Sequence, residues 1–253
     1  MEAGIIIRLC KEVFLGGRIM KYAFVNGKIL DGTKDMKVQE GQIVLTENDK
    51  IVDIVPENTD ISGYQKVDLK GSYLMPGLIN MHVHLAGNGK PQKKQRDNEK
   101  LVSSIMSSGI TRAVAYSMVC GFAKDELFSG VTTIRTVGGL GNFDTRLRDE
   151  IAEGKKTGPR ILAANQGISV PGGHMAGSVA IAAGTIEEAL NHVEQAKKEH
   201  VDLVKLMITG GVMDAKEKGV PGELKMAPEM VRAVCEKAHE EGYIVAAQSS
   251  RHK

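Results

Sequence analysis

The sequence predicts an α/β protein, in which a small β-domain at residues 20–75 precedes a domain of alternating strands and helices at residues 76–253. Two observations support this division. In the first part, short β-branched and aromatic runs are separated by turn signals, with no helical pattern between them. In the second part, apolar runs of strand length alternate with helical segments, which is typical of βα units and a parallel sheet.

The first domain is expected to consist of hairpins. Asn26-Gly27, the strongest short hairpin signal, separates its first two strands, and Asn48-Asp49 separates the next two. These are signals of antiparallel β-structure. The expected strands cover residues 22–25, 28–30, 42–45, 51–55 and 66–69.

The second domain is expected to contain consecutive βα units. A capping box from Thr185 to Glu188 opens one helix, and Pro228 in a first turn with Gly242 after the end delimits another. Residues 92–129 are also expected to be mostly helical, with a break near Gly109. Such units fit either an open doubly wound sheet or part of an eight-stranded barrel, and periodicity does not decide between them. The expected strands cover residues 78–85, 131–137, 160–168, 201–207 and 243–247.

Composition excludes several classes of protein. The formal net charge is +2, with acidic and basic residues mixed along the chain, so no nucleic-acid footprint is indicated. No apolar stretch reaches the roughly 20 residues of a membrane helix. Cys10, Cys120 and Cys235 lie far apart without a metal-binding spacing, which fits a reducing compartment. We therefore expect a cytoplasmic protein.

Residues 1–19 are expected to be a translated leader outside the fold. Met20 opens a strand-and-turn sequence, and the preceding Gly16-Gly17-Arg18-Ile19 can be encoded by a purine-rich ribosome-binding sequence. A secretory signal is not indicated, because Glu2 stands near the start and the apolar run is short. Peptides from upstream of Met20, found by mass spectrometry of the natively expressed protein, would contradict this hypothesis.

Two histidines share one face of the first strand expected in the second domain. In the sequence Asn80-Met81-His82-Val83-His84, residues two apart point to the same side, so both imidazoles face one way. Barrel active sites lie at the C-terminal ends of strands, where such a pair could bind a zinc-type ion through ring nitrogens. A hydrogen-bonded structural pair is the alternative interpretation.

Lys205 is the second unusual residue, because it stands within the apolar strand 201–207. A buried lysine is costly unless it is paired or neutral. A neutral amine can react with carbon dioxide, and the resulting carbamate can bridge two metal ions. A lysine that reaches the barrel mouth, or one paired with a carboxylate, is the alternative.

Several segments carrying these residues resemble the amidohydrolase superfamily, in its imidazolonepropionase-like and Xaa-Pro dipeptidase-like branch. The resemblance extends over residues 21–247. The segments are LMPGLINMHVH at 74–84, GVTTIR at 130–135 followed by Gly138-Gly139, PGGH at 171–174, and VKLM at 204–207 followed by Gly210-Gly211.

This resemblance implies a partial (β/α)8 TIM-type barrel of about five of the eight strands, preceded by an incomplete small β-sandwich. It also implies a hydrolase that acts on carbon–nitrogen bonds through a water activated by one or two divalent metal ions, such as zinc. His82, His84 and a carboxylated Lys205 would be metal ligands, and His174 would contact an amide or dipeptide substrate. A homo-oligomer is also compatible with this fold class.

The chain departs from the family pattern near its end. Gln248 stands where the family has a histidine, and an amide oxygen is a poor zinc ligand. The aspartate expected near the eighth strand has no counterpart, so the catalytic residue stays unknown. The sequence therefore leaves an alternative, in which the chain is a catalytically inactive truncated fragment or pseudoenzyme of the family.

Overall fold

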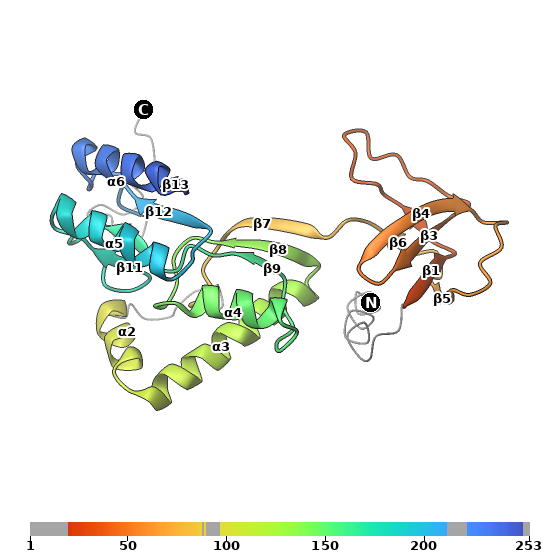
Figure 1. Cartoon of the computed structure of the whole chain (residues 1–253), viewed down its shortest axis with the longest axis horizontal. Helices are drawn as coiled ribbons and strands as arrows, with labels where there is room; N and C mark the ends of the chain where they lie inside the picture. The colour runs from red at the N-terminus through yellow and green to blue at the C-terminus, as the bar shows by residue number, and fades with distance from the viewer. Residues whose placement is uncertain (1–19, 88, 90–96, 212–221, 250–253) are drawn as a thin grey trace. The chain divides into compact units, whose positions relative to one another are not determined.

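The computed structural model describes residues 20–87, 89, 97–211 and 222–249 (Figure 1). The expected leader lies outside the described residues. The contacts divide the chain into two compact units, the first ending at Leu78 and the second beginning at Ile79. The first unit contains short strands, and the second contains parallel sheets with helices, so the fold is mixed α/β.

A four-stranded sheet in the order β4-β3-β1-β5 forms most of the first unit. The expected hairpin between β3 and β4 is confirmed, and Asn48 in its turn has the left-handed φ of 55°. However, β5 is parallel to β1, so the prediction of purely antiparallel pairing is wrong. The strands are β1 (Lys21–Val25), β3 (Gln42–Glu47), β4 (Lys50–Pro56) and β5 (Gln65–Asp68).

The hairpin predicted at Asn26-Gly27 does not form. Asn26 turns the chain with a φ of 55°, but the strand that follows leaves the sheet and pairs in parallel with a later strand. A Cβ on Gly27 would lie 2.3 Å from Leu69 Cδ1, so the turn packs closely against a segment distant in the sequence. The separate pair is β2 (Lys28–Ile29) with β6 (Tyr73–Leu74).

Two sheets organise the second unit, in the orders β7-β8-β9 and β11-β10-β12-β13. The strand predicted at 160–168 is split, because buried Asn165 adopts a left-handed φ of 54° that no regular strand contains. Its amide holds this position by hydrogen bonds of 3.1 and 3.0 Å to the backbone N–H and the hydroxyl of Thr145. The strands are β7 (Leu78–Val83), β8 (Val131–Thr136), β9 (Arg160–Leu162), β10 (Gly167–Ser169), β11 (Ala180–Ala182), β12 (Leu203–Met207) and β13 (Ile244–Gln248).

Five helices are described in the second unit (Figure 1). Ser108 caps a second helix within the predicted 92–129 segment, and α4 was not predicted. None of the described helices is long and apolar enough to cross a membrane. The helices are α2 (Asn98–Met106), α3 (Gly109–Phe128), α4 (Phe143–Ala152), α5 (Ile186–Lys198) and α6 (Pro228–Glu240).

Buried apolar side chains form two large clusters and one small cluster in the second unit. Their burial is the main source of stabilisation for both groups of helices. The first cluster includes Val119 of α3, Ile134 of β8 and Leu147 of α4. The second includes Ile168 of β10, Val193 of α5, Leu206 of β12 and Val234 of α6.

The predicted capping box of α5 provides a test of local stability. Thr185 Oγ1 accepts a hydrogen bond of 3.2 Å from the Glu188 backbone N–H. Thr185→Ala removes this acceptor and should lower the free energy of unfolding by about 1 kcal/mol, measured by urea denaturation. Thr185→Ser retains the hydroxyl, so its free energy of unfolding should be close to that of the native chain. An equal loss of stability in both variants would contradict the capping role.

Candidate metal centre

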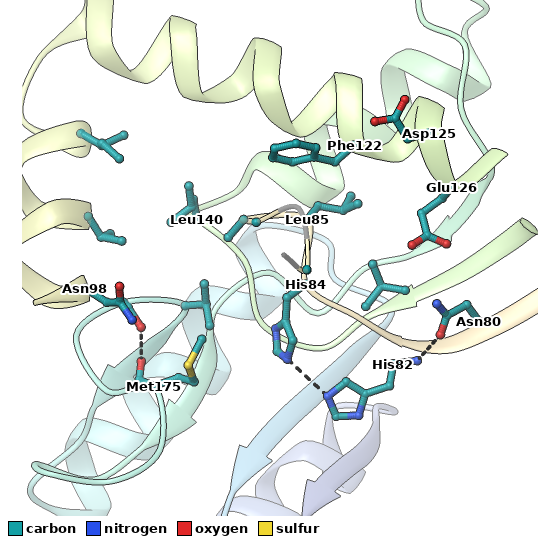
Figure 2. Close-up of a pocket in the computed structure, with 18 of the residues that line it drawn as sticks. Asn80, His82, His84, Leu85, Asn98, Phe122, Asp125, Glu126, Leu140 and Met175 are labelled. Atoms are coloured by element: carbon teal, nitrogen blue, oxygen red, sulfur yellow. Dashed lines mark hydrogen bonds between the residues drawn. The ribbon is translucent and has the colours of Figure 1, made fainter. Parts of the chain in front are cut away.

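His82 lies in β7 and His84 directly follows it, and both side chains project to the same side, as the alternation of an extended chain requires (Figure 2). Their Nε2 atoms lie 3.3 Å apart. His84 Nδ1 is 3.0 Å from the carbonyl oxygen of Gly138, which can only accept a hydrogen bond, so Nδ1 carries the proton. The lone pair on Nε2 of the neutral His84 ring therefore accepts a hydrogen bond from His82 Nε2–H, so the hydrogen-bonded pair raised as the alternative is present.

This spacing fits two ligands of one metal ion. Two nitrogen atoms at about 2.0–2.1 Å from zinc, at a tetrahedral angle, lie roughly 3.3–3.4 Å apart. Burial, followed by the positive charge of Lys205, lowers the pKa of His82, and burial also lowers the pKa of His84. Both imidazoles are consequently neutral near pH 7, which is the form that binds metal.

Histidines and acids alone do not complete a metal site in the described part of the chain. No group of three or more His, Cys, Asp or Glu side chains within it has the arrangement needed to hold an ion. A third ligand from the described residues would therefore be of another kind. A carboxylated lysine would be such a ligand, because its carbamate group offers anionic oxygen atoms.

Lys205 lies at the centre of β12 and is 3% exposed. Burial, assisted by the charge of Arg135, lowers its pKa to about 8. The side chain does not reach solvent, and no carboxylate among the described residues is paired with it. The two alternatives left open by the sequence are thus not realised in these residues.

Small residues flank Lys205 on both neighbouring strands. Ala246 of β13 is its direct partner in the register, and a Cβ on Gly167 of β10 would lie 3.1 Å from Lys205 Cγ. Any larger residue at Gly167 would press on the lysine stem. The sheet therefore accommodates the long side chain by keeping its neighbours small.

Arg135 of β8 is a site residue that the sequence analysis did not select. Its Nε donates a 2.8 Å hydrogen bond to the carbonyl oxygen of Met81, next to the histidine pair. Its charge contributes to lowering the pKa of both His82 and Lys205. The sequence carried one signal for this role. Arg135 stands two positions after Thr133, so both side chains point to the same side of β8.

His174 follows β10 in a glycine-rich turn. A Cβ on Gly211 would lie 2.3 Å from His174 Nδ1, so the ring packs on the backbone beyond β12. The charge of His174 also contributes to the lowered pKa of His82 and of His84. The structure thus brings the four residues selected from the sequence into one region.

Gln248 ends β13, directly opposite Met207 in the register. Its Oε1 is buried and has no hydrogen-bond partner among the described residues. Strand pairing thus places a neutral amide beside the strand that carries Lys205, at the position where a histidine was expected.

A cleft of about 810 Å³ borders the histidine pair (Figure 2). Its walls come from β7, α2, α3 and the segment around Met175. Most of the wall is apolar, while two carboxylates of α3 lie at one end. The apolar lining includes Leu101, Ile105, Phe122 and Leu140, and the acidic residues are Asp125 and Glu126.

Residues 73–253 match the sequence model of the Amidohydrolase family. Among curated relatives, a dihydroorotase of Wolbachia sp. subsp. Drosophila simulans (strain wRi) is 39% identical over 75 residues, which are 29% of this chain and 17% of the relative. A 5-methylthioadenosine/S-adenosylhomocysteine deaminase of Bacillus thuringiensis (strain Al Hakam) is 34% identical over 68 residues, which are 26% of this chain and 16% of the relative.

Solved structures match a larger part of the chain. A candidate prolidase from Bifidobacterium longum aligns with 33% identity and a TM-score of 0.70, over 91% of this chain and 49% of its own. A Xaa-Pro dipeptidase with methionine in its active site aligns with 27% identity and a TM-score of 0.71, over 90% of this chain and 56% of its own. The chain thus spans about half the length of these structures and less than a fifth of the two curated relatives.

Replacement of the buried lysine should change the pH dependence of stability. The folded pKa of Lys205, about 8, lies below the unfolded value of 10.5, so the free energy of unfolding of the metal-free native chain should rise from pH 8 to 10.5. Lys205→Met should abolish this rise and add about 1–3 kcal/mol at pH 7. Urea denaturation across this pH range measures both effects.

The exposed Lys198 of α5 provides the matched control. Lys198→Met removes the same charge from the surface and should leave the pH profile unchanged. A native profile that is flat between pH 8 and 10.5, or one that survives in Lys205→Met, would contradict the burial of a charged lysine.

Proposed function

The chain belongs to the amidohydrolase family, and we propose that it carries the metal-binding part of a hydrolase that cleaves carbon–nitrogen bonds in amides or dipeptides. The observation that carries this proposal is the 3.3 Å spacing of His82 and His84 Nε2 in the same unit as a buried Lys205 of lowered pKa. Family members are metal-dependent, which agrees with a pair of neutral imidazoles. The domain assignment that follows is a partial barrel at residues 76–253 and part of a β-sandwich at residues 20–75.

Three residues would hold one or two divalent ions. Zinc is a suitable metal, because it binds imidazole ligands well. His82 and His84 would bind through Nε2, and a carboxylated Lys205 would add an oxygen ligand. When bound, a metal ion of this kind would supply a water molecule that ionises near neutral pH, and its charge would polarise a substrate carbonyl.

Carboxylation of Lys205 needs the neutral amine. With a pKa of about 8, roughly one molecule in ten is neutral at pH 7. The nitrogen lone pair forms a bond to the carbon of carbon dioxide, one C=O pair moves to oxygen, and the nitrogen releases a proton to water. The positive charge of Arg135 favours the anionic product for the same electrostatic reason that it disfavours the ammonium form.

A dipeptide substrate is favoured by the sequence identity of two structural matches. The prolidase-like and Xaa-Pro dipeptidase structures are 33% and 27% identical to this chain over about nine-tenths of its length. The mainly apolar cleft beside the histidines would receive an apolar side chain. His174, whose glycine-rich turn lies in the same region, would contact the substrate.

The proposal also includes the cellular location and the oligomeric state of the enzyme. The described cysteines, Cys120 and Cys235, are free thiols, which supports a cytoplasmic location. Association into a homo-oligomer is part of the proposal, since closed symmetric assemblies are common among soluble enzymes.

Metal binding tests the proposal directly. The native chain should bind Zn²⁺ or Co²⁺ in calorimetric titration, and His82→Ala or His84→Ala should weaken binding by at least about 100-fold, because each removes a direct ligand. His239→Ala removes an exposed histidine of α6 and serves as the control. The same proteins are assayed for hydrolysis of Xaa-Pro dipeptides.

Two results would overturn the proposal. One is a folded native chain that binds neither ion, which would favour an inactive fragment. The other is dipeptide hydrolysis that persists unchanged in the presence of a chelator, since the reaction would then not depend on metal.

A further inference from the structure

Asp144, in the first turn of α4, is a buried acid that the proposed chemistry does not use. It is 1% exposed, and its Oδ2 has no hydrogen-bond partner among the described residues. Burial raises its pKa to about 6, an effect that the nearby Thr136 hydroxyl partly offsets, although no hydrogen bond to Thr136 Oγ1 is completed. An incompletely paired buried carboxyl group reduces stability, so its presence calls for another explanation.

The carboxyl group packs directly on the backbone of Gly139. A Cβ at Gly139 would lie 2.5 Å from Asp144 Oδ2 and 2.9 Å from both Cγ and Oδ1. Such distances are too short for any side chain, so only glycine allows this contact. Asp144 therefore limits where the main chain of Gly139 can lie.

The neighbouring Gly138 makes the corresponding contact with His84. A Cβ at Gly138 would lie 3.0 Å from His84 Nδ1 and 3.1 Å from Cε1, and the φ of 141° also favours glycine. The Gly138 carbonyl oxygen accepts the 3.0 Å hydrogen bond from His84 Nδ1. The peptide group between the two glycines thus carries the carbonyl that binds His84, and it ends at the Gly139 Cα, on whose side-chain position Asp144 packs.

We propose that Asp144 is a positioning residue for His84, which fixes the Gly138–Gly139 peptide so that its carbonyl holds His84 as the Nδ1–H tautomer. The peptide is planar, so a limit on Gly139 also limits the direction of the Gly138 carbonyl. Groups that orient a metal-binding histidine in this way usually bond its second ring nitrogen directly. Here the carboxyl group acts one step further away, through the backbone.

The inference deepens the proposed function, because it assigns a role to Asp144 in preparing a metal ligand. Its structural part, the tautomer of His84, does not require metal. The two can therefore be tested separately on the full chain.

The tautomer is measured from long-range ¹H–¹⁵N correlations of the imidazole rings in metal-free, ¹⁵N-labelled protein at pH 7.5. The native chain should show His84 as a single Nδ1–H tautomer. Asp144→Ala removes the group that limits Gly139, so the two ring nitrogen shifts of His84 should move towards each other as the tautomers mix. Asp144→Asn retains the shape of the side chain and should restore the native spectrum.

Thr145→Val is the matched control, since Thr145 is the next residue of α4 and is 4% exposed. Its hydroxyl bonds Asn142 and Asn165 instead of facing the glycine pair. The control should lose stability but keep the native His84 spectrum. If Asp144→Ala does not fold, Gly139→Ala replaces it, because the added Cβ displaces the carboxyl group without removing it.

Co²⁺ titration of the same variants provides the second measurement. Asp144→Ala should bind about 10-fold or more weakly than the native chain, with Asp144→Asn and Thr145→Val close to native. A native chain that binds no Co²⁺ would refute the proposed function, while the spectra still decide the role of Asp144. That role is refuted if folded Asp144→Ala or Gly139→Ala keeps the native tautomer, or if Thr145→Val disturbs it equally.

Discussion

The burial of an ammonium group within a parallel sheet is the constraint on which the second unit depends. Lys205 is 3% exposed at the centre of β12, and none of the described carboxylates offsets its charge. Such a position is tolerated because the pKa of the group falls and because Gly167 and Ala246 leave space along its stem. A hydrophobic residue would stabilise the sheet more, so the lysine is retained at a cost to stability.

Residues without bulky side chains also surround the histidine pair. Gly138 allows its backbone to approach the ring of His84, and Gly139 allows the backbone to approach Asp144. The hydrogen bond to the Gly138 carbonyl then defines which nitrogen of His84 is free. A backbone carbonyl, which needs no side-chain ordering, thus orients the ring of His84.

The outer strands of the two sheets carry exposed apolar side chains. Apolar side chains at the exposed edges are open to solvent: Ile79 and Met81 of β7 are 64% and 44% exposed, and Ile244 of β13 is 64% exposed. Edges of this composition tend to pair with further strands.

The sequence alone determined the features that depend on local periodicity and turn chemistry. Alternation along a strand placed His82 and His84 on one side, Asn48 marked a real hairpin, and the Lys205 anomaly was visible in its apolar run. Tertiary contacts decided the rest, because they join residues far apart in the chain. After Asn26 the chain packs against Leu69 and pairs with β6, where the sequence predicted a hairpin.

Asn165 and Asp144 show the same limit within the second unit. Neither residue is unusual in its own stretch of sequence. Asn165 interrupts a strand because Thr145 holds its amide, and Asp144 acquires its contacts only once α4 docks beside the glycine pair. The sequence therefore specified which residues could carry chemistry, while long-range packing decided which groups surround them.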